Sequence, residues 1–240
     1  VTWSVSGGGS ISPVTVVTDG DGLAAAERVL GPASGAQSAQ ASVDGFTGSP
    51  VTFTHTAFPA NPTALVLVSG DDQTAPGGFE VAEDLVVRLE DANGNGIGGR
   101  PITWVVGSGS GAVNPVSGTT NANGLATTRW TLPNPVGQYT VNAVFSGLPP
   151  VVFSATATAD EPTTIEMVSG NGQSAPVGTA VTNPLVVRVT DATDNPVSGV
   201  SVAWTAVGGG SVSSDNTATD AQGLAQVTRI LGLVPGNYMT

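Results

Sequence analysis

The chain has 240 residues, of which 33 are Gly, 17 are Pro and none is Cys, and only 10% are charged. All six basic residues are Arg, so a Walker-type phosphate lysine, a lysine Schiff base, a disulfide and a zinc–cysteine site are excluded. The 18 acidic residues give a formal net charge of -12, which repels polyphosphate backbones. We therefore expect no nucleic acid partner.

The composition is that of a folded chain rich in strands and turns. Hydrophobic residues make up 40% of the sequence and the mean hydropathy is +0.18, so there is apolar surface to bury. No apolar run approaches the roughly 18 residues of a membrane-spanning helix, and we expect no transmembrane segment. Val, Thr, Ser, Gly and Ala dominate, which favours strands over helices.

The sequence repeats itself at a spacing of 100 residues, which is typical of an array of similar units. Residues 68–104 align without a gap with residues 168–204, and 17 of these 37 positions are identical. The second half of the unit occurs a third time at the beginning of the chain. We predict a partial unit at 1–62 that lacks its N-terminal strands, a complete unit at 63–162, and a unit at 163–240 that lacks its last strand.

Both ends of the sequence fall inside a predicted unit. Val1 corresponds to Ile102 or Val202, in the middle of a strand, and Thr240 lies near the position of Val141. We therefore expect this sequence to be part of a longer chain, for which the lack of a signal peptide is uninformative.

Within each unit, apolar residues alternate along short segments with the period of a β-strand. Turn signals such as Asn93-Gly94 and Asn123-Gly124 separate these segments. Seven to nine short strands in ~100 residues, with a central Trp, are typical of an immunoglobulin-like sandwich. The predicted fold is all-β, a tandem array of immunoglobulin-like β-sandwiches with about 100 residues per repeat. The alternation occurs at Leu85, Val87 and Leu89, at Ile102, Trp104 and Val106, and at Val151, Phe153 and Ala155.

Three consecutive motifs of the third unit carry a resemblance to a known family. They read SGNGQSAPVG (169–178), PLVVRVTDATDNPVSGVSVAW (184–204) and TDAQGLA (219–225). This pattern resembles the group 1 bacterial Ig-like domains, the tandem repeats of invasin- and intimin-type surface proteins. The match covers the middle unit, most of the third and the latter half of the first. The resemblance implies a surface or envelope setting.

Trp130 occupies the family's W-x-L position, but its equivalents in the other two units are Arg28 and Arg229. The other aromatic residues mostly recur at core positions. An exposed Trp130 would therefore be the best single contact residue for a ligand. A position at the rim of the core is the interpretation that we favour.

Asp91, Asn93 and Asn95 are the candidate metal ligands, because 91–96 resembles the start of a calcium loop. Ile102 stands where the bidentate Glu of such a loop is required. The third unit loses two of the spaced ligands at 191–196. A hairpin turn explains both versions, since Asp and Asn suit turn geometry. We expect no cofactor, and keep calcium at these turns or at Asp160-Glu161 as an alternative.

No arrangement of residues predicts catalysis or cofactor binding. His55 is the only His, it lies on the apolar face of its strand, and nothing places a nucleophile and an acid beside it. The Gly-rich runs are not followed by a helix whose N-terminus could bind an anion. Adjacent carboxylates on a strand point to opposite faces and do not form a dyad. Such pairs are Asp71-Asp72, Glu83-Asp84 and Asp160-Glu161.

These observations predict a non-enzymatic, extracytoplasmic structural or adhesive module, a rigid array of Ig-like units in a bacterial surface or envelope protein. Its partner would be a protein, either a host or cell-surface receptor or neighbouring subunits of an envelope assembly. One alternative is an accessory structural subunit docked onto a larger envelope or membrane complex. Another is a non-catalytic module attached to a secreted hydrolase.

Overall fold

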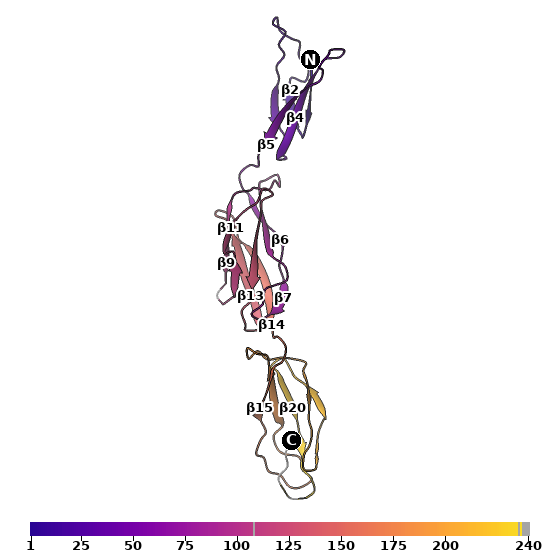
Figure 1. Cartoon of the computed structure of the whole chain (residues 1–240), viewed down its shortest axis with the longest axis vertical. Coiled ribbons are helices and arrows are strands. Elements are labelled where there is room, and N and C mark those ends of the chain that lie inside the picture. The colour runs from indigo at the N-terminus through magenta and orange to yellow at the C-terminus, as the bar shows by residue number, and fades with distance from the viewer. Residues whose placement is uncertain (108, 235, 237–240) are drawn as a thin grey trace.

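The chain folds into three successive groups of strands, or units, which follow one another along one long axis (Figure 1). The computed structural model describes residues 1–107, 109–234 and 236, and within them it contains strands β1–β21 and no helix. We propose to divide these strands at the predicted boundaries, into unit 1 (1–62), unit 2 (63–162) and unit 3 (163–240). The predicted all-β, Ig-like fold is confirmed.

Unit 2 is a two-sheet sandwich. One sheet has the order β10-β12-β8-β6 and the other β11-β9-β13-β14-β7. All pairings within these sheets are antiparallel except that of β7 with β14, which is parallel. The nine strands are β6 (Ala64–Ser69), β7 (Gln73–Pro76), β8 (Leu85–Glu90), β9 (Pro101–Val106), β10 (Ala112–Asn114), β11 (Ser117–Thr119), β12 (Leu125–Thr131), β13 (Gly137–Val144) and β14 (Val151–Thr158).

The core of unit 2 follows the alternation in the sequence. In β8, Leu85, Val87 and Leu89 are fully buried, while the residues between them are half-buried. From the opposite sheet, Trp104 and Phe153 pack with their ring centroids 5.8 Å apart. Burial of side chains of this size contributes roughly 1.5–3 kcal/mol each, so the packed core stabilises this sandwich without the help of a disulfide, since the chain has no Cys.

Unit 1 contains one three-stranded sheet, β1-β4-β5, and the hairpin β2-β3. Trp3 and Phe53 repeat the aromatic pair of unit 2 with the same centroid distance of 5.8 Å. Unit 1 has no described counterpart of β6 and β8, which complete the opposite sheet in unit 2, and Phe53 is 44% exposed whereas Phe153 is 0% exposed. The strands are β1 (Thr2–Ser6), β2 (Gly9–Ser12), β3 (Glu27–Leu30), β4 (Gly35–Ser42) and β5 (Val51–Ala57).

Unit 3 repeats the first part of unit 2. The sheet β15-β16-β20 corresponds to the sheet that contains β6, β8 and β12, and β17-β19 and β18-β21 form two further pairs. Trp204 lies in a smaller cluster with Val189, Val202 and Val227. The strands are β15 (Thr164–Ser169), β16 (Leu185–Thr190), β17 (Ser201–Ala203), β18 (Ser211–Val212), β19 (Asn216–Ala218), β20 (Leu224–Val227) and β21 (Arg229–Ile230).

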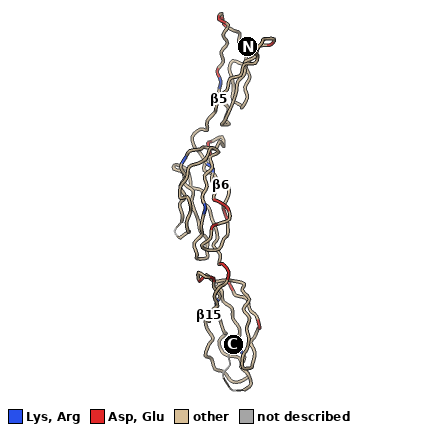
Figure 2. The backbone as a smooth tube through the Cα atoms, viewed as in Figure 1, with Lys and Arg blue, Asp and Glu red and all other residues tan. Residues whose placement is uncertain are grey.

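Acidic residues occur on all three units (Figure 2). In the described part of the chain, none of the elements is a helix of the length and apolarity that a membrane crossing needs.

Candidate functional site: the junctions between units

A tight turn after β8 lies at the junction of units 1 and 2. The carboxylate of Asp91 holds this turn, because Oδ1 accepts the backbone N–H groups of Asn93 at 2.8 Å and of Asn95 at 2.9 Å. Its other oxygen, Oδ2, accepts the N–H of Ala60 at 2.8 Å, which fixes the linker from unit 1. Asp91 is therefore the residue that binds the turn to the linker.

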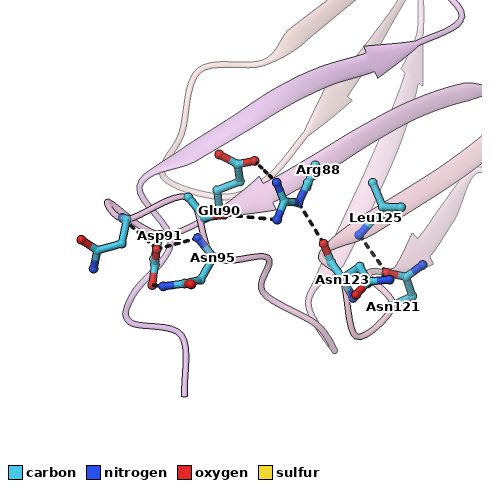
Figure 3. A network of polar contacts seen from close by, with 9 residues as sticks. Arg88, Glu90, Asp91, Asn95, Asn121, Asn123 and Leu125 are labelled. Atoms are coloured by element: carbon cyan, nitrogen blue, oxygen red, sulfur yellow. Dashed lines mark hydrogen bonds and ion pairs between the residues drawn. The ribbon is translucent and has the colours of Figure 1, made fainter. Parts of the chain in front are cut away.

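Asn95 connects the same turn to unit 1 itself. Its Nδ2 donates to Oδ2 of Asp91 at 2.9 Å and to the carbonyl of Pro32 at 2.7 Å. Its Oδ1 accepts the N–H of Ser34 at 2.8 Å. Figure 3 shows the side chains of Asp91 and Asn95 facing each other within the turn. All the hydrogen-bonding capacity of the Asn95 amide except one acceptor lone pair is used, so its orientation is well defined.

The junction of units 2 and 3 repeats this arrangement. Oδ1 of Asp191 accepts the N–H of Asn195 at 2.9 Å, and Oδ2 accepts the N–H of the linker residue Asp160 at 3.1 Å. Nδ2 of Asn195 donates to the carbonyl of Asn134 at 2.8 Å, and its Oδ1 accepts the N–H of Val136 at 3.3 Å. We call each Asp–Asn pair with its partner loop a clasp. Clasp 1 is Asp91 and Asn95 with 32–34, and clasp 2 is Asp191 and Asn195 with 134–136.

Both clasps hold their carboxylate in the ionised form. The hydrogen bond from the side chain of Asn95, together with that from Ala60, lowers the pKa of Asp91 far below its usual range. Burial acts to raise the pKa of Asp191, but the hydrogen bonds from Asn195 and Asp160 outweigh it, and its pKa is also strongly lowered. N–H donors that point at a carboxylate favour its charged form.

Arg88 of β8 supports clasp 1 from within unit 2 (Figure 3). Its guanidinium donates to the carbonyl of Gly94 at 3.1 Å and to that of Asn123 at 3.0 Å. It also forms an ion pair with Glu90 at 2.6 Å. Arg88 therefore ties the clasp turn to the neighbouring turn at 121–125.

The three candidate calcium ligands do not converge as a cation site would require. Both carboxylate oxygens of Asp91 already accept hydrogen bonds from N–H groups. These donors stabilise the negative charge of the carboxylate and occupy the lone pairs that a cation would need. Asn95 is directed across the junction, and Asn93 is exposed and contributes its backbone N–H. Among the described residues, no group of three or more His, Cys, Asp and Glu side chains is placed to hold a metal. At the second junction, Asp160 contributes only a backbone N–H to the clasp.

Trp130 is fully buried and not an exposed contact residue. Its Nε1 donates to the carbonyl of Ser110 in the Gly/Ser loop at 2.7 Å. Arg28 and Arg229 perform this task in the other units. Arg229 donates to the carbonyls of the loop residues Gly209 at 2.5 Å and Ser211 at 3.0 Å. The three residues share the role of satisfying loop carbonyls, which explains why Trp and Arg interchange there.

His55 lies in β5 opposite Gln37 of β4, and its side chain is half-buried. The expectation for the adjacent carboxylates was wrong in one respect, because Asp71-Asp72, Glu83-Asp84 and Asp160-Glu161 all lie in connections between strands. Asp71 and Asp72 lie between β6 and β7, and Asp72 has a φ of 53°. Because they are not on a strand, both carboxylates reach the hydroxyl of Ser154.

The fold and its junctions define an array of Ig-like sandwiches. The E. coli adhesin FdeC has a similar structure, with a TM-score of 0.60 and 19% identity over 98% of this chain and 78% of that one. The D0-D1 domain of intimin aligns with a TM-score of 0.32 and 23% identity over 73% of this chain and 87% of its own. The likeness to the FdeC structure shows the fold expected from the resemblance. No protein-family model and no curated protein matches the sequence.

Sequence reasoning found the clasp turns but missed their function. The signal was present, since an Asp and an Asn four residues apart recur 100 residues later. The partner loops carry no comparable signal, because 32–34 and 134–136 take part through backbone groups.

Proposed function

We propose that this chain is a non-enzymatic structural and adhesive module, a rigid spacer array in an extracytoplasmic protein of a bacterial surface or envelope. The observation that carries the proposal is the clasp, which occurs with the same chemistry at both junctions. A repeated device that fixes one unit on the next serves a chain that holds something at a defined distance and direction.

Each clasp limits the freedom of its junction in two ways. Asn95 makes two hydrogen bonds to backbone groups of unit 1, and Asp91 binds the linker residue Ala60. The linker is also held on its other side, because the N–H of Thr63 donates to the carbonyl of Glu90 at 2.8 Å. A linker with its backbone bonded at both ends has few conformations left.

The polar side chains of the chain support a structural role. Asp91, Asp191 and Asn195 are buried and bond across junctions, and Arg229 is buried and bonds to loop carbonyls. The similar protein FdeC is described as an adhesin, which favours a protein receptor as the partner at one end of the array.

The role as a spacer is tested in the organism that makes the protein, by deleting unit 2 in frame. The deletion of 63–162 joins Pro62 to Thr163 and brings loop 32–34 next to the Asn195 clasp, so the junction chemistry is kept while the array becomes shorter. Surface exposure is measured by protease treatment of intact cells. We expect the shortened protein to remain exposed and attachment to fall. Unchanged attachment, or a protein that the protease cannot reach, would contradict the proposal.

A second variant separates the effect of rigidity from that of length, because it removes the buried hydrogen bonds of one clasp and keeps all three units. Asn195→Ala removes the bonds from one clasp without shortening the chain. If rigidity matters as well as length, this variant also attaches less well than Asn93→Ala, in which only an exposed side chain is lost.

A further inference from the structure

The chain enters unit 2 at one end of the sandwich and leaves it at the opposite end. β6 begins beside clasp 1, since its first residue Ala64 pairs with Glu90. β14 ends beside clasp 2, because Thr158 accepts the N–H of Gly77, and Gly77 lies against the backbone of Asn134. A force that separates units 1 and 3 therefore pulls β6 and β7 toward one end of unit 2 and β14 toward the other.

The parallel pairing of β7 with β14 lies across this line of force. Four residue pairs are in register, from Gln73 with Ala155 to Pro76 with Thr158. Because the strands run in the same direction and are pulled in opposite directions, they must slide past each other before unit 2 can open. All hydrogen bonds of such a ladder are loaded together, whereas bonds that are peeled from one end are loaded one at a time.

The acidic pair that precedes β7 extends this ladder. Oδ1 of Asp71 accepts the backbone N–H of Ser154 at 2.8 Å, and the Ser154 hydroxyl lies 3.1 Å from the same atom. Asp72 contacts the same hydroxyl through its own Oδ1. These side chains take the place of backbone pairs where the chain crosses from one sheet to the other.

Gln73 fixes the beginning of β7 to the body of the unit. Its Nε2 donates to the carbonyls of Gly70 at 2.8 Å and Glu83 at 2.9 Å, and its Oε1 accepts the N–H of Glu83 at 2.7 Å. Gln173 makes the same three bonds in unit 3, to Gly170 and Asn183. The Gln of the repeated Q-x-A-P motif thus holds the strand against sliding.

We infer that residues 71–77 and 154–158 of unit 2 form a latch that resists tension along the array. The latch goes beyond the proposed spacer function, because it gives unit 2 a mechanical role that rigidity does not require. Its strength is kinetic, since forced unfolding is governed by the barrier to unfolding.

The test is to weaken the latch and pull the chain from its two ends by single-molecule force spectroscopy. Gln73→Ala removes the three hydrogen bonds that fix the beginning of β7. We expect the unfolding force of unit 2 to fall below that of the natural chain, and an unchanged force would overturn the latch.

The control removes side-chain hydrogen bonds from a part of unit 2 that tension does not load. Asn121→Ala removes the two bonds that Asn121 accepts in the turn before β12. The unfolding force of this variant should equal that of the natural chain. Equal decreases in force for Gln73→Ala and Asn121→Ala would overturn the latch.

A second variant weakens the latch on its other strand, β14. Ser154→Ala removes the hydroxyl that Asp71 and Asp72 contact, and Ser117→Ala is its control in β11, a strand that tension does not load. We expect the unfolding force of Ser154→Ala to fall below that of Ser117→Ala, while their urea midpoints differ little. An unchanged force for Ser154→Ala would show that the acidic pair does not belong to the latch. These measurements use the isolated chain, so their result is independent of attachment to cells.

Discussion

The side-chain oxygen of Asn95 accepts the backbone N–H of Ser34 at 2.8 Å across the boundary between two units. The corresponding bond at the next boundary joins Asn195 to Val136. Ser and Val have nothing in common as side chains, and the bond is conserved between the junctions because it uses the backbone. The clasp therefore tolerates changes in the partner loop, but not the loss of its Asn.

Loss of the clasp amide should loosen one junction at a time. Asn95→Ala removes two hydrogen bonds between units, each worth about 0.5–1.5 kcal/mol. We expect a broader distance distribution between spin labels at Thr52→Cys and Thr127→Cys, measured by double electron–electron resonance. Labels at Gln138→Cys and Ser201→Cys, across the second junction, should be unaffected. The control is Asn93→Ala, and equal broadening in both variants would contradict the assignment to Asn95.

The clasps should withstand mild acid. Because the folded-state pKa values of Asp91 and Asp191 are lowered, their contribution is complete above the unfolded-state pKa of about 3.9 and is lost as the pH falls through the lower folded-state value. The label distances should thus stay narrow from pH 7 to about pH 4 and broaden only in stronger acid. Broadening at pH 5 to 6 would contradict this, and Asp91→Asn should be broad across junction 1 at every pH.

The buried guanidinium of Arg229 should be essential to unit 3. Arg229→Leu leaves loop carbonyls such as those of Gly209 and Ser211 without their charged donor, and each such bond is worth about 1.5–3 kcal/mol. Faster hydrogen exchange, measured by mass spectrometry, should be confined to peptides of unit 3. Arg100→Leu, at an exposed position, is the control, and exchange in unit 3 no faster than in this control would contradict the role.

Equivalent aromatic residues should differ in their contribution to stability. Phe153→Ala creates a cavity in a closed core and should cost about 3–5 kcal/mol, measured as local opening by hydrogen exchange. Phe53→Ala removes a side chain that is 44% exposed and should cost clearly less. Equal costs would mean that the face of Phe53 is as well covered as that of Phe153.

The strands and their buried faces could be predicted from the sequence where both sheets of a sandwich are present. The alternation at Leu85, Val87 and Leu89 specified the buried face of β8, and the structure confirms it. The same alternation at Val51 and Phe53 does not lead to burial, because unit 1 has no described counterpart of β6 and β8 to complete the opposite sheet. A pattern reports which face is apolar, and burial depends on what lies opposite.

The junctions could be predicted only in part. Asp91 and Asn95 were recognised as turn residues, and the turn is present. The bonds of Asn95 to the carbonyl of Pro32 and to the N–H of Ser34 join residues 61 to 63 positions apart. Because the partners are backbone groups, no residue type at 32–34 identifies them in a single sequence. The exchange of Trp130 for Arg was visible, but its reason required the positions of the loop carbonyls.

The central claim is that the clasps make the three units one extended array. Small-angle X-ray scattering of the whole chain tests it most directly, by comparing the natural sequence with Asn95→Ala/Asn195→Ala. We predict that the natural chain scatters as the extended arrangement in Figure 1 does, and that the double variant has a smaller radius of gyration and a broader distribution of dimensions. Superimposable profiles from the two proteins would contradict the account.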